Sequence, residues 1–211
     1  MIKKWLAVGT VAMAFTLGAC GSNTTEVDEE PEQTTASENV EETEEVSGKE
    51  EEPAEESEPG KRSNPIAVGE TKVVDIAIYD NESNEYNGKA EITVNSVMRG
   101  EDAWTEILGT NEFNEEPAEG QEYLMADVTA TLLEAETEDY AWYMDAMNFS
   151  FIGSDGSPYE WTSVVVEPEL NGEIFEGGTL QGKVTNMVKE GDTILLVFED
   201  SSFDNIFFAT E

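Results

Sequence analysis

The sequence has 211 residues, of which 48 are acidic and 10 basic, so the formal net charge at pH 7 is −38. Nucleic acid and anionic lipid headgroups require Lys and Arg for binding, so this charge excludes nucleic acid as a partner. The sequence has no histidine, which removes the commonest general base and metal ligand. Its single cysteine cannot close an intramolecular disulfide and offers zinc too few of its preferred ligands.

The first twenty residues have the order of a bacterial export signal. Lys3 and Lys4 precede an apolar run from Trp5 to Leu17, and small residues follow before Cys20. An uncleaved transmembrane helix is the alternative, but this run of 13 residues is shorter than the roughly 20 needed to span the hydrocarbon core. We therefore predict a signal peptide over residues 1–19.

The segment Leu17-Gly18-Ala19-Cys20 resembles the lipobox of bacterial lipoproteins. The resemblance implies that Cys20 carries a covalent diacylglyceryl lipid and becomes the first residue of the mature chain, whose net charge is −40 without the two signal lysines. Acyl chains contribute about 0.8 kcal/mol per buried CH₂, which holds a protein at a bilayer without a spanning helix. We expect a lipid anchor in the cell membrane, on the extracytoplasmic face of a Gram-positive bacterium.

Residues 20–63 form an expected acidic tether after the lipidated cysteine. Residues 21–60 contain 16 acidic residues, one lysine and no Leu, Ile, Met or aromatic residue. Burial cannot offset the chain entropy of such a segment, so we predict a disordered linker. An alternative is that the acidic run collects divalent cations or docks on a basic partner.

Residues 64–211 are predicted to form one all-β domain, an immunoglobulin-like sandwich with one short helix. Short runs rich in Val, Ile, Thr, Phe and Tyr alternate with Gly, Asn, Asp and Pro clusters, which is typical of a sandwich. With about 147 residues, the domain needs neither metal nor disulfide to build a core. The predicted strands are 72–79, 89–98, 122–133, 147–152, 162–166, 179–188, 193–199 and 205–209.

Three local patterns refine this prediction. Alternation from Leu124 to Leu132 places one face of that strand on the core. Asn87-Gly88 and Asp155-Gly156 are hairpin signals, because both supply the positive φ angles of tight turns. Residues 101–108, with acidic residues in the first turn, predict a short helix that we expect at an open end of the sandwich.

Four stretches of this region resemble an uncharacterised domain family of Gram-positive lipoproteins. The resemblance implies a telokin-like, immunoglobulin-type sandwich, related in fold to a secreted mycobacterial antigen, that acts as an extracytoplasmic interaction domain without agreed catalytic residues. One departure is Asn186, where the family more often has an apolar or aromatic residue, and a buried amide without partners costs about 1–3 kcal/mol. The stretches are NPIAVGE (64–70), AEITVNSVMRGEDAW (90–104), NEFNEEPAEGQEYL (111–124) and EPELNGEIFEGGTLQGKV (167–184).

Asp80, Glu82 and Asn84 place oxygen side chains at alternate positions of a loop, as calcium loops do. The glycine and distal glutamate of an EF-hand are missing, so a solvated turn is the favoured interpretation and we assign no metal ligand. Asp200 and Asp204 form a similar but thinner pattern.

Catalytic patterns are weak. Glu115 and Glu116 are paired carboxylates, but a catalytic pair requires a cleft that separates their pKa values. Ser154, Ser157 and Ser163 have no histidine partner and no G-x-S-x-G elbow. The Gly-Gly pair at 177–178 lacks the lysine of a phosphate-binding loop. We assign no catalytic residue and no cofactor other than the lipid.

Trp142, Tyr143, Tyr159 and Trp161 are two aromatic pairs near predicted strand ends, and they are candidates for recognition of a peptide or sugar. Core packing is the favoured alternative. The sequence thus predicts a non-enzymatic binding module for an unidentified envelope protein, peptide or glycan. The alternatives are a carboxylate-dependent hydrolase, with or without a divalent cation, and an acidic surface whose main role is solubility in a salty or alkaline habitat.

Overall fold

The computed structural model of the chain describes residues 57–211. The predicted signal peptide, Cys20 and most of the predicted tether lie outside the described residues. All the described residues belong to one compact unit. No helix in the described part is long and apolar enough to cross a membrane.

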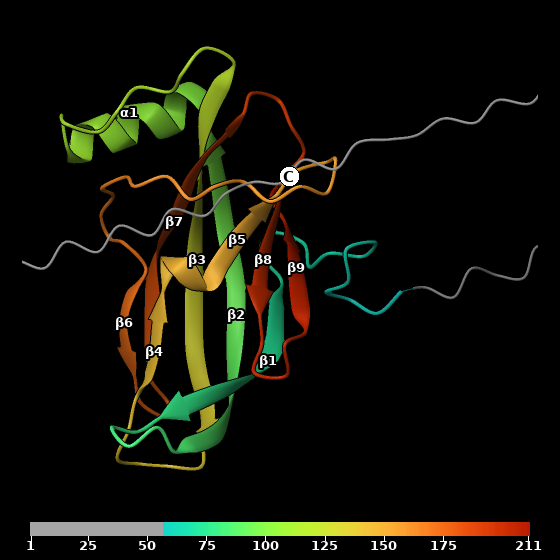
Figure 1. Cartoon of the computed structure of the whole chain (residues 1–211), viewed down its shortest axis with the longest axis vertical. Helices are drawn as coiled ribbons and strands as arrows, with labels where there is room; N and C mark the ends of the chain where they lie inside the picture. Colours follow the sequence, from blue (N-terminus) through green and yellow to red (C-terminus); the bar gives the residue numbers. More distant parts are fainter. Residues whose placement is uncertain (1–56) are drawn as a thin grey trace, which may run out of the picture. The chain divides into compact units, whose positions relative to one another are not determined.

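The described part is mostly β, with one short α-helix (Figure 1). The predicted all-β class is confirmed at this level, and the immunoglobulin-like or telokin-like type stays a prediction. The elements are β1 (Thr71–Tyr79), β2 (Glu85–Arg99), α1 (Gly100–Thr110), β3 (Gln121–Ala135), β4 (Trp142–Asp145), a single 3-10 turn (Ala146–Asn148), β5 (Phe149–Ile152), β6 (Asn171–Ile174), β7 (Thr179–Lys189), β8 (Leu195–Glu199) and β9 (Asn205–Ala209).

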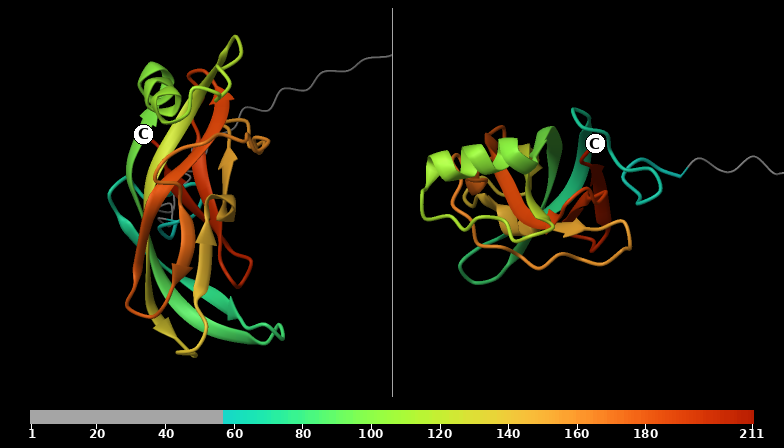
Figure 2. Two further views of the ribbon diagram at one scale, coloured as in Figure 1. Left: turned by 90° about the vertical axis from the view of Figure 1, so that its left-hand side faces the viewer. Right: turned by 90° about the horizontal axis from the view of Figure 1, so that it is seen from above.

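The strands form one large and two small sheets that face each other across the core (Figure 2). The large sheet is antiparallel with the order β1-β2-β3-β7, so β1 lies at one edge. Opposite it lie the pair β4-β6 and the three-stranded sheet β5-β8-β9. The opposing layer is therefore divided, and β4 and β8 belong to different sheets.

The alternation predicted for residues 124–132 is confirmed in β3. Its alternate apolar side chains, from Leu124 to Leu132, are fully buried in the main core between the sheets. Tyr123 and Met125, on the other face of the strand, are also buried. The first half of β3 is thus covered on both sides.

The helix lies at one end of the domain (Figure 1), but it packs on the outer face of the large sheet there and does not plug the opening between the sheets as expected. Ala103 and Ile107 of α1 pack on Tyr123 and Met125 in a second, smaller core. Lys183 of β7 holds the helix through an ion pair with Glu106, and it also donates a hydrogen bond to the Glu167 carbonyl in the segment before β6. Apolar residues on the outer face of β3 explain this position, because a helix can bury them only from that side.

The predicted strand at 162–166 does not form; this segment is irregular and is held by two asparagine side chains. Asn186 on β7 accepts a hydrogen bond from the Thr162 N–H (2.8 Å) and donates one to the Glu160 carbonyl (3.1 Å). Asn114 accepts from the Val165 N–H and donates to the Val165 carbonyl, each at 2.9 Å. Side-chain amides replace the strand ladder here, so the buried amide of Asn186 has partners.

The prediction of a hairpin turn at Asn87-Gly88 is wrong. Both residues lie inside β2, and the turn after β1 is formed by Asp80–Asn84. Glycine is needed at position 88 for close packing, since a Cβ there would lie 2.7 Å from Ile76 Cδ1 and 2.8 Å from the Glu134 carbonyl oxygen. Asp155-Gly156 does form a turn, with Gly156 at φ +87° and its N–H bonded to the Gly153 carbonyl at 2.9 Å.

Replacing Asn186 by Ala should destabilise the domain by about 1–3 kcal/mol, because the Thr162 N–H and the Glu160 carbonyl lose their partners. Urea unfolding measures the change. Asn95→Ala is the control: that exposed amide binds only Asp127 and Thr129 side chains, and its loss should cost less than about 0.5 kcal/mol. Equal losses for the two variants would contradict the anchoring role of Asn186.

Candidate functional site

A groove of about 410 Å³ opens between the two layers. It is lined by the end of β1, the start of β4, the end of β8 and the turn that joins β8 to β9. Figure 1 shows that this turn lies beside β1. The groove therefore forms where the edge of the large sheet faces the division in the opposing layer.

The groove has an apolar floor and an aromatic rim. Ile78, Trp142 and Phe198 line it and are buried. Tyr79, Tyr143 and Phe203 line it with exposed fractions of 59%, 53% and 81%. Exposed aromatic side chains beside a hollow are typical of a binding surface, since they offer contact area at low entropy cost.

Phe203 has a backbone conformation that phenylalanine rarely adopts. Its φ is +64°, and the corresponding residue of the β1–β2 turn, Ser83, has φ +65°. In both turns the backbone N–H of this residue bonds to the carbonyl of the first aspartate, Asp200 or Asp80, at 3.0 Å. Gly or Asn suits such a position, so Phe203 brings an aromatic ring to the groove at a cost in backbone strain.

The same turn geometry accounts for the candidate calcium residues. Asp80 Oδ1 accepts the N–H groups of Glu82 (2.8 Å) and Asn84 (2.9 Å), and Oδ2 accepts from Asn84 Nδ2 (2.8 Å) and the Tyr86 hydroxyl (3.2 Å). These bonds, chiefly the one from the Asn84 side chain, lower the pKa of Asp80 below 3.8. Both oxygens of its carboxylate are thus engaged within the turn and the strand that follows it.

Asp200 has the same role in the β8–β9 turn, where its Oδ1 accepts the Ser202 and Asp204 N–H groups at 2.9 Å. Within residues 57–211, no three acidic, histidine or cysteine side chains stand close enough to hold a metal ion. The two oxygen-rich loops are thus a repeated hairpin turn, built on an aspartate that caps its own backbone.

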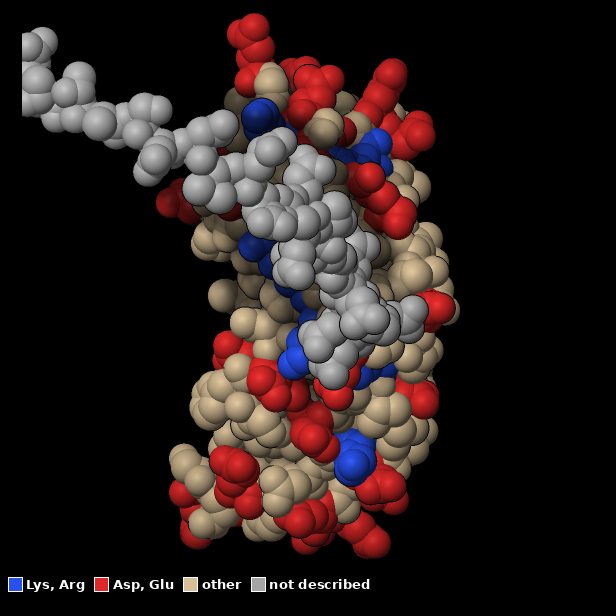
Figure 3. Space-filling view, turned by 90° about the vertical axis from the view of Figure 1, so that its right-hand side faces the viewer, with Lys and Arg blue, Asp and Glu red and all other residues tan. Residues whose placement is uncertain are grey.

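The groove has no positive charge of its own. Its lining includes Glu199 and Asp200 but no Lys or Arg, and the described part as a whole has 33 acidic and seven basic residues, a net charge of −26. On the face shown in Figure 3, acidic side chains gather towards both ends of the domain. A cation can therefore enter this groove without meeting a fixed positive charge.

The four aromatic candidates do not form one surface. Trp142 and Tyr143 line the groove, but only Tyr143 is exposed, since Trp142 packs in the core. Tyr159 and Trp161 line a separate hollow of about 150 Å³ together with Met147. Tyr143 belongs to the groove rim, and its two partners there, Tyr79 and Phe203, were not recognised from the sequence.

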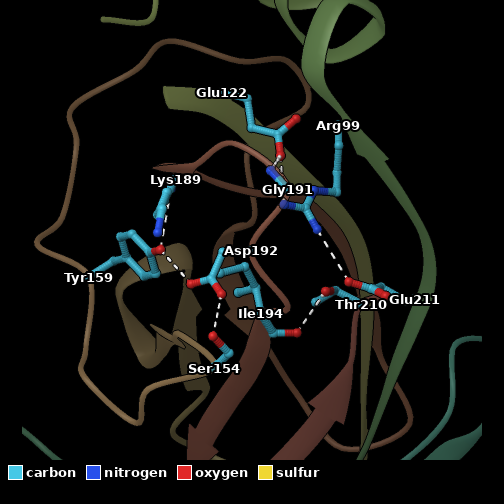
Figure 4. Close-up of polar contacts among 10 residues, drawn as sticks. All are labelled: Arg99, Glu122, Ser154, Tyr159, Lys189, Gly191, Asp192, Ile194, Thr210 and Glu211. Carbon is cyan, nitrogen blue, oxygen red and sulfur yellow. Dashed lines mark hydrogen bonds and ion pairs between the residues drawn. The ribbon is translucent and has the colours of Figure 1, made fainter. Parts of the chain in front are cut away.

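Ser154 lies in a hydrogen-bond network that suits structure better than nucleophilic catalysis (Figure 4). Its hydroxyl donates to Asp192 Oδ1 (2.5 Å), and Tyr159 donates to Oδ2 (2.7 Å). The bond from Ser154, with that from Tyr159, lowers the pKa of Asp192 below 3.8. Burial, with the bond to Asp192, raises the pKa of Tyr159 above 10. A carboxylate of lowered pKa is a weak base for activating serine.

Glu115 and Glu116 are not presented as a pair. Glu116 lines a hollow of about 280 Å³ together with Glu101, Glu122, Glu190 and Trp104, and Glu115 is not part of that lining. Arg99 Nη2 binds Glu122 Oε1 at 2.6 Å, so one of these carboxylates is already neutralised.

No protein-family model matches the chain, and no curated protein matches it. Among solved structures it is similar to a candidate lipoprotein, YcdA, from Bacillus subtilis subsp. subtilis strain 168, with a TM-score of 0.42 and 15% sequence identity. The match covers 56% of this chain and 35% of the other, so the chain spans about a third of that protein's length. The similarity is distant and structural.

Asp192→Asn should destabilise the domain at neutral pH but not in strong acid. Because folding lowers the pKa of Asp192, its contribution is complete above about pH 4 and is lost as the pH falls through the folded-state pKa. Unfolding in urea from pH 7 to pH 2 should show the two proteins converging. Glu112→Gln, which removes a charge from an exposed loop, should leave the pH profile unchanged; a constant Asp192→Asn deficit at every pH would contradict the prediction.

Proposed function

We propose that the protein is a lipid-anchored extracytoplasmic binding module, that its domain belongs to the telokin-like type, and that its groove takes a cationic partner without catalysing a reaction. The observation that carries the binding role is the groove itself. It combines three exposed aromatic residues with acidic residues, and its lining contains no Lys or Arg. The anchor rests on the lipobox at residues 17–20.

Cations and aromatic faces attract each other because the ring quadrupole is negative above and below the plane. Each contact contributes about 0.5–1 kcal/mol when exposed and about 2 kcal/mol when desolvated. Glu199 and Asp200 add Coulomb attraction, which also accelerates association at low salt. Lys and Arg side chains of an envelope protein or peptide meet both requirements.

The strained position of Phe203 supports the same function. A large exposed ring in the left-handed region contributes little to folding, so its place at the rim is best explained by contact with a partner. The β1–β2 turn has Ser83 at the equivalent position, and this turn does not line the groove. The two turns therefore provide an internal comparison of strain with and without a binding role.

A hydrolase is the second candidate, and the acidic hollow around Glu116 is the observation that favours it. Assays of ester, glycoside and peptide hydrolysis, with and without calcium, test it directly. We expect no turnover. Robust turnover that Glu116→Gln abolishes would overturn the non-enzymatic role.

Phe203→Asn should stabilise the domain by about 1 kcal/mol and weaken binding of hexalysine by about 2-fold to 30-fold. Asn suits the positive φ but lacks the ring, and the charge is unchanged. Thermal melts and calorimetric titration at low ionic strength measure the two effects.

Two controls match this variant. Ser83→Asn should stabilise the β1–β2 turn without changing hexalysine binding. Phe113→Ala removes a ring of similar exposure, 84%, away from the groove, and should also leave binding unchanged. If hexalysine binds Phe203→Asn as tightly as the original protein, the cationic groove is wrong.

Cys20→Ser should release the protein from the membrane fraction, because the hydroxyl does not receive the thioether-linked lipid. Mass spectrometry of the original protein should show cleavage after residue 19 and a diacylglyceryl addition at Cys20. An unmodified Cys20 in a protein recovered from the cytosol would contradict both the anchor and the extracytoplasmic location.

A further inference from the structure

The edge of the large sheet opens directly into the groove. β1 pairs with β2 on one side only, since it is the first strand of the order β1-β2-β3-β7. The Asp80 N–H bonds to the Asn84 carbonyl at 3.1 Å, which makes these two residues a hydrogen-bonded pair. Antiparallel pairs alternate, so the backbone groups of Asp75, Ala77 and Tyr79 point away from β2.

Two independent contacts agree with this alternation. The Asp75 carbonyl, on the outward side, accepts a hydrogen bond from the Ser201 N–H at 3.1 Å. Asn87, the partner of Ala77 in the register, directs its backbone carbonyl to the Glu136 N–H at 2.9 Å and not to β1. The outward direction of the groups at positions 75, 77 and 79 is thus established from both strands.

The edge is occupied at Asp75 and open beyond it. The β8–β9 turn, through Ser201, takes the outward carbonyl of Asp75. For Ala77 and Tyr79, both of which line the groove, the described residues supply no hydrogen-bond partner to the outward N–H and C=O groups. Four backbone groups, spaced as in a β ladder, therefore face the groove.

The charge of the domain indicates what kind of chain could pair with this open edge. A second copy of the domain carries the same net charge of −26, and the acidic segment at residues 21–60 is also repelled. A strand added to an edge places alternate side chains on opposite faces. On the outer face it meets Tyr79, whose hydroxyl binds Glu85 Oε2 at 3.1 Å, and in the groove it meets Glu199 and Phe203. Each face thus offers an aromatic ring and a carboxylate.

We propose that the groove takes an extended peptide rich in Lys or Arg, which pairs with the backbone of Ala77 and Tyr79 as an additional strand of the large sheet. This inference rests on the proposed cationic groove and specifies how it binds. Main-chain hydrogen bonds supply affinity, and the aromatic and acidic rim selects basic side chains.

Three heptapeptides with blocked ends test the proposal on the mature chain carrying Cys20→Ser. The first peptide alternates Lys and Val, and the second replaces each Lys by Glu. The third keeps the Lys and Val side chains but has N-methyl groups on the backbone amides of all residues between its two ends, which removes their N–H donors. Calorimetric titration measures affinity, and hydrogen exchange by NMR follows the Ala77 and Tyr79 amides. We expect binding of the Lys peptide, slower exchange at these two amides, and at least about 10-fold weaker binding of the other two peptides.

Ala77→Pro and Val73→Pro are the matched protein variants. Both positions have outward N–H groups on β1, where proline is tolerated at a sheet edge, but only Ala77 lines the groove. Ala77→Pro should weaken binding of the Lys peptide by at least about 10-fold, and Val73→Pro should leave it unchanged. Circular dichroism verifies folding; if Ala77→Pro unfolds, the N-methylated peptide and the amide exchange decide the question.

The outcomes separate the two proposals. Equal binding of the N-methylated peptide, or unchanged exchange at Ala77 and Tyr79, overturns strand addition but leaves the cationic groove. Equal binding of the Glu peptide overturns selection by charge. If neither the Lys peptide nor hexalysine binds at low ionic strength, the cationic groove and the strand addition are both wrong.

Discussion

The burial of β3 on both faces is the constraint on which the rest of the domain depends. Leu124 and its alternate neighbours fill the main core, and Tyr123 and Met125 require a second cover on the outer face. That cover is α1, held by Lys183 and by the irregular segment after Trp161. β3 pairs with β2 and β7, and β2 pairs on its other side with β1, which has no further neighbour in the large sheet and lies at its edge. The position of the helix thus follows from this one strand, and the groove opens at the edge of the sheet that β3 helps to build.

The period-2 pattern predicted β1, β2, β3 and β7 because these strands are long and bury alternate side chains over much of their length. It missed β4 and β6, which have four residues each and pair with one another. It placed a strand at 162–166 because Val-rich composition does not reveal that Asn114 and Asn186 bind this backbone. It interpreted Asn87-Gly88 as a turn because a glycine required for close packing and a glycine required for positive φ are identical in sequence.

The candidate site was less predictable than the fold, because its rim comes from three distant parts of the chain. Tyr79, Tyr143 and Phe203 line the same groove only because of the pairing of β1 and the position of the β8–β9 turn. A signal for Phe203 was present all the same. DNESN (80–84) and DSSFD (200–204) share an aspartate at the first position and differ at the fourth, where a turn of this kind suits Gly or Asn. An aromatic residue at that position indicates a role other than folding.

An open strand edge beside an apolar groove is ordinarily a hazard, because two copies can pair through it. Proteins commonly prevent this with charges on the edge strand itself, and the groove-facing part of β1, from Ile76 to Tyr79, has none. The net charge of the whole domain provides the protection, since it repels every identical copy at long range. The same charge attracts a basic chain. One property of the sequence, its large acidic excess, thus allows the edge to stay open and is also the basis of the basic partner that we propose.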